Sequence, residues 1–594
     1  MQSAETVVGI LRERGRRDLP CDELYRQLFN PSLYLMAWGE IYANEGAMTP
    51  GIDRETADGM SLAKIGRIID ALRHERYRFQ PVKRVYIPKK NGRKRPLGLP
   101  SWSDKLVGTV MRILLEAYYE PQFSGRSHGF RPRRGCHTAL AEVDSTWTGT
   151  TWFIEGDIAD CFGSLDHSVI PGILGEKIRD NRFLRLIGNM LRAGYLEDWV
   201  RNATLSGAPQ GGTLSPVLSS IYLDRMDKFA ETVLIPRYTR GKRRRNDPAW
   251  EKAAGEFRAA RQRGDRAKAR ELRQQRRGLP SRDTRDPDYR RLRYIRYADD
   301  ILLGFTGPKA EAGEIKQQLA VFLRDELKLD LSADKTLITH ARTQRARFLG
   351  YEILVQHCAT RPRVNGHIGL RVPMDVIKAR QSPYLYHGTP WDRPRLLNLD
   401  DLQIIRTYGE EYRGFVQYYL LAGNVYALNR LRYAMETSML KTLACKHRST
   451  VTKMARTYKT IIATEHGPRT CFEARQERPG RKPLAARFGG IPLKRQRKAV
   501  IDDRIPVPPP RRRELVTRLL RGECELCEQH APVETHQVAK LAELARTGQR
   551  PPWAAKMAKM RRKTLIVCAP CHQVIHTGKP AADCTSTSLE SRMR

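Results

Sequence analysis

The sequence lacks any uninterrupted apolar run near the roughly 18 residues that a membrane span requires. Its first residues also lack the apolar centre of a secretory signal, so we expect a cytoplasmic protein with no membrane partner. Cysteine is scarce, with 11 in 594 residues, which excludes a disulfide-built fold. Acidic residues number 65 against 106 lysines and arginines, for a formal net charge of +41. Because this surplus is clustered, it favours a nucleic-acid partner over a role in solubility alone.

The length corresponds to about four structural units, since domains average roughly 150 residues. The composition shifts along the chain without a repeat of fixed period. Apolar side chains recur at helical spacing between residues 62 and 72, and VKRVYIP (82–88) follows as a predicted strand. A basic Asn-Gly turn (89–95) then leads to a helix capped by Ser101. This region therefore predicts a strand, a positively charged turn, a second strand and a helix.

The strongest chemical pattern is acidic. TWFIEGDIADCFGSLD (151–166) is typical of a strand that ends near Asp157, and RLRYIRYADDILLGF (291–305) is typical of two strands whose turn carries Asp299 and Asp300. Adjacent carboxylates repel unless a cation lies between them. If the strands are neighbours, the carboxylates can share two divalent ions about 3.5–4 Å apart, as in polymerases. Taken alone, however, an Asp-Asp pair is better explained as two favourable turn residues.

Three further stretches have distinct compositions. Residues 240–290 predict two charged helices that project as a hairpin, which either contacts RNA or is simply solvated. Residues 400–460 repeat apolar side chains at helical spacing, and this pattern predicts a small bundle. Residues 470–515 are rich in arginine, lysine, proline and glycine, which is typical of a linker with basic anchoring points.

Two Cys-x-x-Cys pairs lie near the C-terminus, Cys524 with Cys527 and Cys568 with Cys571. Four soft ligands at this double spacing predict a tetrahedral Zn²⁺ site that staples a small module. The other seven cysteines have no partner at ligand spacing. Three histidines accompany the pairs, and the last two of them share a helix face because they are four residues apart. They are His536, His572 and His576.

Together, these stretches resemble the reverse transcriptases encoded by group II introns, from residue 49 to the end of the chain. The blocks that carry the resemblance follow the family's order: TPGID (49–53), RPLGLP (95–100), SHGFRPRRGCHTAL (127–140), EGDIADCFGSLDH (155–167), GAPQGGTLSPVLSSIYLDRMD (207–227), YADD (297–300), LSADKT (331–336) and FLGY (348–351).

The resemblance implies an α+β multidomain fold, built on a right-hand polymerase with an antiparallel palm sheet. The implied domains are fingers (1–150), palm with a basic helical insertion (151–365, insertion at about 240–290), a helical thumb bundle or maturase domain (366–468), a basic linker and DNA-binding region (469–522), a zinc-stapled ββα-metal (HNH) module (523–580) and a tail (581–594).

The resemblance also implies roles for single residues. Asp157, Asp299 and the backbone carbonyl of Ile158 would bind two catalytic Mg²⁺ ions, and Asp300 would support the site. Phe162 would lie against the sugar edge and favour deoxynucleotides, although spacing alone favours a core phenylalanine. Four residues would contact the incoming deoxynucleoside triphosphate: Lys89 and Arg95 as fingertip cations, Gln210 at the nucleotide pocket and Lys335 as a proton donor to pyrophosphate.

In the family, the thumb and fingers bind the intron RNA and assist its splicing. YRGFVQYY (412–419) and LKTLACKHRSTVTKMARTY (440–458) resemble thumb segments, and ARFGGIPLKRQ (486–496) resembles the DNA-contacting stretch that follows them. Neutralising several phosphates would make RNA binding steeply salt dependent. The candidate RNA-contacting residues are Lys441, Lys446, Arg448, Lys453 and Arg456.

The end of the chain resembles the HNH endonuclease domain of many such proteins, in which His536, His572 and His576 would hold a second divalent metal. The family's usual pair of histidines is here His536-Gln537, and the second position corresponds to the general base. Glutamine cannot take up a proton near neutral pH, so DNA cleavage is left open.

We therefore expect a bacterial group II intron-encoded protein that acts as RNA-directed DNA polymerase and maturase. Its partners would be intron RNA, target DNA and deoxynucleoside triphosphates, with a homodimer left open. Two alternatives remain: a splicing chaperone with a vestigial polymerase site, and a reverse transcriptase recruited to another system. The intact aspartates disfavour the first alternative, and the thumb and HNH resemblance disfavours the second.

Overall fold

The computed structural model describes residues 2–88, 92, 94–197, 200–202, 212–283, 286–358, 364–465, 467–478, 481–499, 510–541, 544 and 551–578. Lys89, Gln210 and the tail predicted at 581–594 lie outside the described residues. Within the described part of the chain, no helix is both long and apolar enough to cross a membrane.

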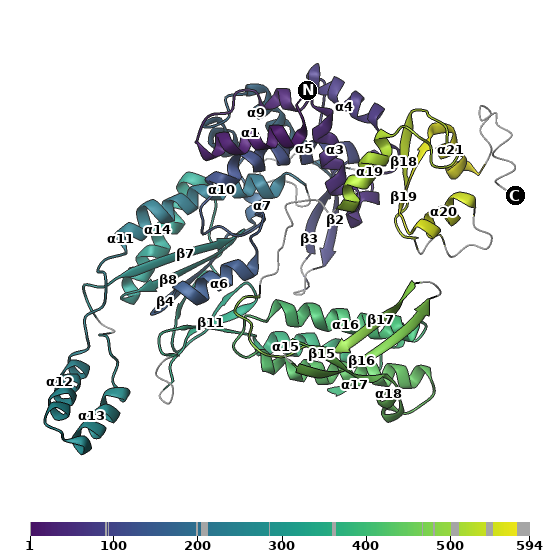
Figure 1. Cartoon of the computed structure of the whole chain (residues 1–594). Helices are drawn as coiled ribbons and strands as arrows, with labels where there is room; N and C mark the ends of the chain where they lie inside the picture. Colours follow the sequence, from purple (N-terminus) through teal and green to yellow (C-terminus); the bar gives the residue numbers. More distant parts are fainter. Residues whose placement is uncertain are drawn as a thin grey trace.

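A four-stranded antiparallel sheet, in the order β7-β8-β4-β9, forms the middle of the fold (Figure 1). Side chains alternate between its faces, so successive residues enter different apolar cores. Phe153 and Leu302 pack into the core on one face, whereas Ile154, Ile301 and Leu303 pack into the core on the other. The strands of this sheet are β4 (Trp152–Asp157), β7 (Arg291–Tyr297), β8 (Asp300–Thr306) and β9 (Leu337–His340).

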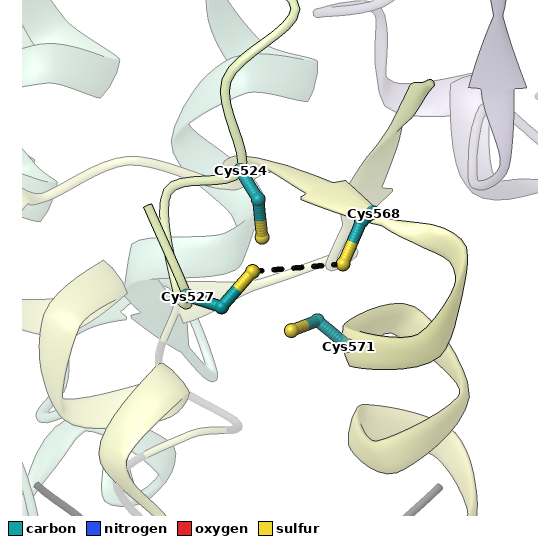
Figure 2. A group of neighbouring side chains, drawn as sticks. All are labelled: Cys524, Cys527, Cys568 and Cys571. Atoms are coloured by element: carbon teal, nitrogen blue, oxygen red, sulfur yellow. Dashed lines mark hydrogen bonds between the residues drawn. The ribbon is translucent and has the colours of Figure 1, made fainter. Parts of the chain in front are cut away.

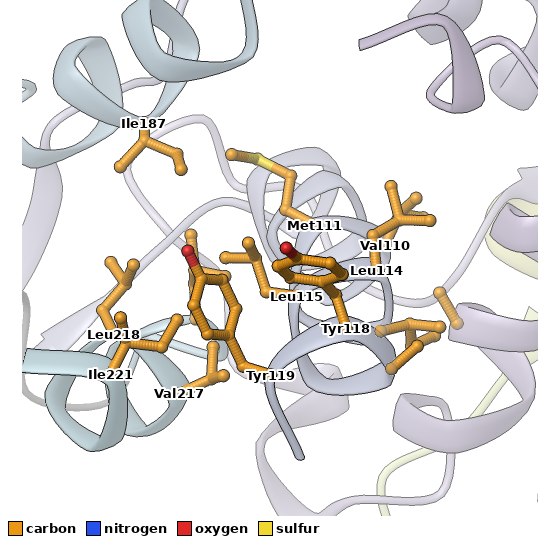
Figure 3. Close-up of a cluster of buried hydrophobic side chains, with 14 of the residues drawn as sticks. Val110, Met111, Leu114, Leu115, Tyr118, Tyr119, Ile187, Val217, Leu218 and Ile221 are labelled. Atoms are coloured by element: carbon orange, nitrogen blue, oxygen red, sulfur yellow. The ribbon is translucent and has the colours of Figure 1, made fainter. Parts of the chain in front are cut away.

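The first core extends through the N-terminal helices. The expected two strands and helix are present, whereas residues 89–91 and 93 of the predicted basic turn lie outside the described residues. The side chain of Ser101 accepts a hydrogen bond from the Asp104 backbone N–H and so caps the helix. This long helix is buried on almost every side, with the helices that follow β4 packed against it (Figure 3). The elements are α1 (Ala4–Arg16), α2 (Leu24–Gln27), α3 (Pro31–Ile41), β1 (Met60–Ser61), α4 (Leu62–Arg73), β2 (Val82–Pro88), β3 (Lys94–Leu99), α5 (Trp102–Tyr119), α6 (Cys136–Thr146), α7 (Cys161–Ser164), α8 (Val169–Gly175), α9 (Asn181–Leu191), β5 (Tyr195–Glu197), β6 (Val200–Asn202) and α10 (Ser215–Phe229).

The predicted helical hairpin is formed by α12 (Pro248–Gln262) and α13 (Arg266–Gly278), and it projects away from the sheet (Figure 1). Asp247 caps the first helix by accepting hydrogen bonds from Ala249 and Trp250 N–H groups. The hairpin has only a small core, in which Leu272 packs and the Arg276 guanidinium lies 5.6 Å from the Trp250 ring centroid. Short α11 (Ile235–Arg237) precedes the hairpin, and α14 (Lys309–Leu327) follows β8.

The second core joins the sheet to the expected helical bundle. The predicted linker at 470–515 is wrong in its first part, because β15, β16 and β17 form a three-stranded sheet. Phe472 and Phe488 of that sheet are buried against α16, so apolar alternation outweighs the basic composition. The elements are β10 (Ala346–Phe348), β11 (Tyr351–Val355), β12 (Ile368–Arg371), α15 (Met374–Gln381), β13 (Leu385–Tyr386), β14 (Thr389–Pro390), α16 (Asp401–Tyr418), α17 (Asn429–Lys446), α18 (Val451–Tyr458), β15 (Lys459–Thr464), β16 (Gly467–Arg478) and β17 (Arg481–Gly489).

The C-terminal module lies beside the N-terminal helices α3 and α4, far along the sequence from them (Figure 1). Its first strand, β18, pairs antiparallel with the short strand β1 of the N-terminal region, with Met60 opposite Thr535 and Ser61 opposite Glu534. The module's apolar residues belong to the first core. Its elements are α19 (Pro510–Leu520), β18 (Val533–Gln537), α20 (Pro552–Met560), β19 (Thr564–Cys568) and α21 (Ala569–Thr577).

Two glycines of α16 give a matched test of how closely the three-stranded sheet approaches the helix. A Cβ on Gly409 would overlap the carbonyl oxygen of Arg487, whereas a Cβ on Gly414 would meet nothing within 4 Å. We expect Gly409→Ala to destabilise this unit by about 1–3 kcal/mol through overpacking. Gly414→Ala should be neutral or stabilising by up to about 1 kcal/mol, because alanine favours helix. Hydrogen exchange of the α16 amides measures both changes, and equal protection in the two variants would contradict the close approach.

Candidate functional site

Three aspartates lie together at one end of the four-stranded sheet. Asp157 ends β4 and is the direct antiparallel partner of Asp300, the first residue of β8. Asp299 lies beside them in the turn between β7 and β8, where Ala298 adopts a left-handed φ of 54°. Strand register and a tight turn therefore bring together carboxylates that are far apart in the sequence.

The electrostatics of this cluster reflect the crowding of negative charge. Burial, followed by the negative charges of Asp299 and Asp157, raises the pKa of Asp300 to about 6. Burial together with the charge of Asp157 also raises the pKa of Asp299. A cation at this place would relieve the repulsion that these shifts express.

Lys335 and Arg95 supply positive charge to the cluster. Lys335 Nζ donates a hydrogen bond to Asp157 Oδ2 at 2.7 Å. The lysine is placed by its own turn, because Ser332 N–H donates to the Asp157 carbonyl and the Lys335 N–H donates to the Ser332 carbonyl. Arg95, in β3, acts electrostatically on Asp299 and lowers its pKa, against the larger effect of burial. Ile158 is buried and bridges to Leu331 in the same turn region.

A loop from the N-terminal region closes the edge of β7 beside the aspartates. His128 N–H donates to the Arg296 carbonyl, and Arg296 N–H donates to the Arg126 carbonyl. Any side chain at Gly129 would overlap the backbone of Ala298, so the loop meets the acidic turn directly. The next residue, Phe130, is 44% exposed and lies edge-on to Phe162, with ring centroids 6.1 Å apart. Phe162 is thus half-buried with an aromatic partner rather than a core residue.

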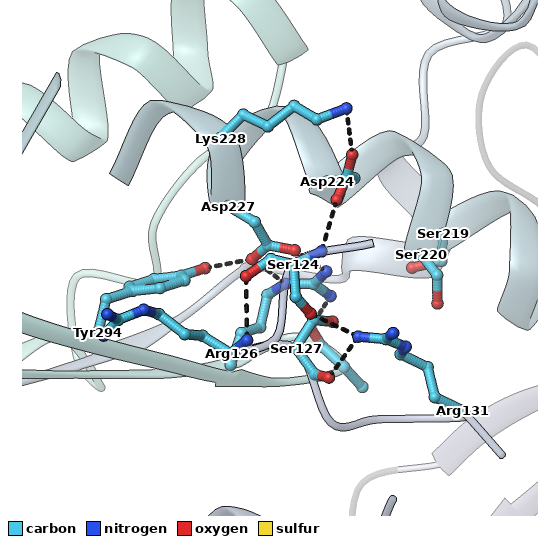
Figure 4. Close-up of polar contacts among 12 residues, drawn as sticks. Ser124, Arg126, Ser127, Arg131, Ser219, Ser220, Asp224, Asp227, Lys228 and Tyr294 are labelled. Atoms are coloured by element: carbon cyan, nitrogen blue, oxygen red, sulfur yellow. Dashed lines mark hydrogen bonds and ion pairs between the residues drawn. The ribbon is translucent and has the colours of Figure 1, made fainter. Parts of the chain in front are cut away.

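A buried ion pair fixes the hairpin that carries Asp299 and Asp300. Arg296 donates to both carboxylate oxygens of Asp227, at 2.8 and 2.5 Å, and Tyr294 donates to the same carboxylate at 2.7 Å. Arg296 also donates to the Ala298 carbonyl in the turn at 2.9 Å. Figure 4 shows the carboxylate of Asp227, on α10, meeting the hydroxyl of Tyr294, on β7. Sequence patterns do not single out this pair. Asp227 is one polar residue near the end of a helix, and Arg296 is one residue of a strand in which polar and apolar side chains alternate.

The four predicted zinc cysteines converge in the C-terminal module (Figure 2). Their sulfurs lie within 4.8 Å of one another, and three of the four residues are buried. Zn–S bonds of about 2.3 Å place neighbouring sulfurs about 3.8 Å apart in a tetrahedron. The Cys527 and Cys568 sulfurs are 3.8 Å apart, so the donor set fits a zinc ion.

The three histidines also converge, and they meet a residue that sequence reasoning missed. His536 on β18 and His572 and His576 on α21 surround the carboxylate of Asp58, which precedes β1. Burial opposes ionisation, but hydrogen bonds with His536 and His572 hold the pKa of Asp58 well below its usual range. For His572, burial opposes protonation, yet hydrogen bonds to Asp58 and Glu534 raise its pKa to about 9. The sequence gives no sign that Asp58 lies near these histidines, because the pairing of β1 with β18 is what brings it there.

Comparison with known proteins agrees with this geometry. The family model for reverse transcriptase (RNA-dependent DNA polymerase) matches residues 87–240, that for type II intron maturase matches residues 366–469, and that for AI2M/AI1M-like HNH endonuclease matches residues 524–572. Group II intron-encoded protein LtrA of Lactococcus lactis subsp. cremoris is 38% identical over 94% of this chain and 96% of its own length. The chain belongs to the group II intron-encoded proteins.

Two fungal relatives extend the similarity beyond bacteria. An uncharacterized 91 kDa protein in the cob intron of Schizosaccharomyces pombe is 32% identical over 94% of this chain and 70% of its own length. A putative COX1/OXI3 intron 1 protein of Saccharomyces cerevisiae is 30% identical over 93% of this chain and 68% of its own length. This group II intron-encoded protein therefore contains reverse transcriptase, maturase and HNH endonuclease-like domains.

The predicted RNA-contacting cations of the maturase domain differ in their surroundings. Lys441 donates to the Pro390 carbonyl at 2.8 Å, and Lys446 donates to the Leu399 carbonyl and to Asp401, both at 2.7 Å. These two lysines are half-buried and hold the domain together. The remaining three cations are exposed on or before α18: Arg448, Lys453 and Arg456.

Removing the carboxylate of Asp227 tests how the acidic turn is fixed. We expect Asp227→Asn to cost about 3–5 kcal/mol, because it leaves the Arg296 guanidinium buried without its counter-charge. Hydrogen exchange of the β7 and β8 amides measures the loss. The control is Asp325→Asn, which breaks an exposed pair with Arg324 and should leave exchange unchanged. Wild-type protection in Asp227→Asn would show that the pair does not support the turn.

Proposed function

We propose that this protein polymerises DNA on an RNA template at the cluster of Asp157, Asp299 and Asp300. The observation that carries the proposal is the strand register, which sets Asp157 directly opposite Asp300 with Asp299 in the adjoining turn. In this assignment the sheet is the palm, residues 1–150 are the fingers and residues 366–468 are the thumb. The alternative of a splicing chaperone with a vestigial polymerase site is disfavoured, because the carboxylates and their supporting turn are intact.

The donor set fits divalent cations. Carboxylate oxygens are the preferred ligands of Mg²⁺. Burial, and after it the charge of the neighbouring carboxylates, raises the pKa of both Asp299 and Asp300. We assign Asp157, Asp299 and the Ile158 carbonyl as ligands and Asp300 as their support. Two bound Mg²⁺ ions would stabilise the attacking and leaving oxygens of phosphoryl transfer.

Cations and aromatic rings around the aspartates would bind the incoming deoxynucleoside triphosphate. Arg95 on β3 and Lys335 beside Asp157 are placed to attract phosphate charge, and a guanidinium can bind two phosphate oxygens at once. The Phe130–Phe162 pair presents bulk at the same end of the sheet, which supports exclusion of a 2′-hydroxyl by Phe162. We extend the nucleotide site to Lys89 and Gln210 on the family resemblance alone.

Primer extension on an RNA template tests the polymerase site. We expect Asp157→Asn to lower the rate at least about 10³-fold, since a lost charge on a metal ligand costs several kcal/mol of transition-state stabilisation. Asp325→Asn, which removes an exposed carboxylate that pairs with Arg324, serves as the control. Intron splicing assisted by the inactive variant would show that the two activities are separable. Full extension by Asp157→Asn would overturn the assignment.

The maturase domain would bind the intron RNA through its exposed cations. Arg448, Lys453 and Arg456 extend from one short segment, and Lys453 and Arg456 are one turn apart on α18. Two exposed rings of the same domain, Tyr386 and Trp391, lie 5.5 Å apart by centroid and are suited to stacking on unpaired bases. Phosphate contacts from the cations would give affinity, and stacking would favour folded RNA with accessible loops.

The salt dependence of RNA binding tests the exposed cations. The double variant Lys453→Ala/Arg456→Ala should bind intron RNA more weakly and should flatten the plot of log affinity against log salt by about 1 for each lost phosphate contact. Its charge-matched control is Arg16→Ala/Arg17→Ala, because both arginines are exposed on or just after α1 and pair with Glu13. An equal flattening in the two double variants would contradict a localised RNA surface on α18.

The C-terminal module would engage the DNA target. Its cysteine cluster fits Zn²⁺, which would hold β19 and α21 to the loop before β18. The side-chain amide of Gln537 donates to the Tyr42 carbonyl at 2.8 Å, so this residue is used in docking the module. We therefore assign DNA binding to the module and assign no general base to Gln537.

A further inference from the structure

Asp58 enters the histidine cluster from the other end of the chain. Gly59, with a positive φ of 73°, turns the backbone so that its N–H donates to the Thr535 carbonyl at 2.8 Å. Asp58 itself accepts a hydrogen bond from the Gln537 N–H at 2.7 Å. The loop that carries Asp58 is also held to the start of α5, because the Glu55 carboxylate accepts a hydrogen bond from the Ser103 hydroxyl at 2.7 Å. Asp58 is thus held in place before any ion binds.

The four side chains have the spacing of a coordination shell. Asp58 Oδ2 lies 2.9 Å from His576 Nε2 and 3.3 Å from His572 Nε2, and the two imidazole nitrogens are 3.0 Å apart. Metal–nitrogen bonds of about 2.0–2.1 Å place tetrahedral ligand atoms about 3.3 Å apart. All four candidate ligand atoms, that of His536 included, lie within 4.8 Å of one another.

His536 provides an independent sign of a missing ligand. Its ring is 4% exposed and packs edge-on against Trp553. Nδ1 lies 3.3 Å from Asp58 Oδ1, and Nε2 has no hydrogen-bond partner among the described residues. A buried polar group without a partner is costly, and a bound cation would satisfy it. The ring of His536 lies 5.3 and 5.4 Å by centroid from those of His572 and His576, in the middle of the cluster.

Glu534 orients one of the histidines as a second-layer carboxylate does in metal sites. It accepts from His572 Nδ1 at 2.6 Å, which leaves Nε2 directed at Asp58 and His576. Glu534 also pairs across the strands with Ser61, three residues after Asp58. The same strand contact therefore positions both the carboxylate and the histidine.

The geometry points to Asp58 as the fourth ligand of a transition-metal ion that it shares with His536, His572 and His576, so that one ion locks the C-terminal module onto the N-terminal region. Three imidazoles select an ion of the zinc class over Mg²⁺. Three histidines alone would leave a coordination position for water, whereas a carboxylate closes a tetrahedral shell. Docking by Asp58 therefore makes this a structural site. The proposal uses the HNH likeness of the module and is independent of the polymerase assignment.

Metal content of the full-length protein tests this assignment. After chelation and reloading with Zn²⁺, wild type should retain two zinc ions per chain, one at the cysteines and one at Asp58. Asp58→Asn, which preserves shape and removes the ligand charge, should retain one. His572→Ala should lose the same ion. Asp70→Asn, an exposed carboxylate on α4, is the matched control and should retain two.

Cobalt substitution and hydrogen exchange separate the outcomes. With Co²⁺, the thiolate charge-transfer band should persist in Asp58→Asn while the weaker histidine-site band is lost, which also shows that the module is folded. Zn²⁺ should protect the amides of residues 58–61 and 533–537 in wild type and not in Asp58→Asn. A single zinc in wild type, two zinc ions in Asp58→Asn with unchanged affinity, or binding of Mg²⁺ in preference to Zn²⁺ would each overturn the proposal. Primer extension should be unaffected by Asp58→Asn, so a failed polymerase assignment is recognised separately.

Discussion

Repulsion among carboxylates at one end of a sheet is the constraint on which the rest of the structure depends. Asp157, Asp299 and Asp300 are brought together by strand register and a tight turn, and burial makes their charges harder to tolerate. Neutral side chains would pack there at lower cost. The protein instead surrounds the cluster with cations, and it ties the turn to α10 through a fully buried Arg296–Asp227 pair. Such an arrangement is stable only as part of a large, well-packed body, which the two cores supply.

The alternation of side chains in the central sheet explains how one sheet serves two such cores. Side chains on one face belong to the core that continues through the N-terminal helices to the C-terminal module, and side chains on the other face belong to the core of the maturase domain. The acidic end of the sheet is therefore supported from both faces. Movement of either body relative to the sheet would displace the aspartates, because β4, β7 and β8 each contribute side chains to both cores.

Local patterns predicted much of this architecture. Period-2 alternation around Asp157 and the YADD turn gave the right strands, and Ser101 and Asp247 cap helices as their positions suggested. Composition led to the wrong prediction of a linker where β16 and β17 lie, because the few apolar residues of these strands stand among many arginines. The place of Asp58 in the histidine cluster could not be predicted for a different reason. It depends on strand pairing between residues more than 470 positions apart, and no local pattern encodes such a pairing.

The pairing of β1 with β18 has a consequence for how the chain is made. Met60 leaves the ribosome long before Thr535, and at about 5–20 residues per second the interval is roughly half a minute to a minute and a half. Throughout that time β1 is an open edge, and the helices around it can assemble without their final neighbour. The C-terminal module can thus dock on β1 only after β18 has been synthesised.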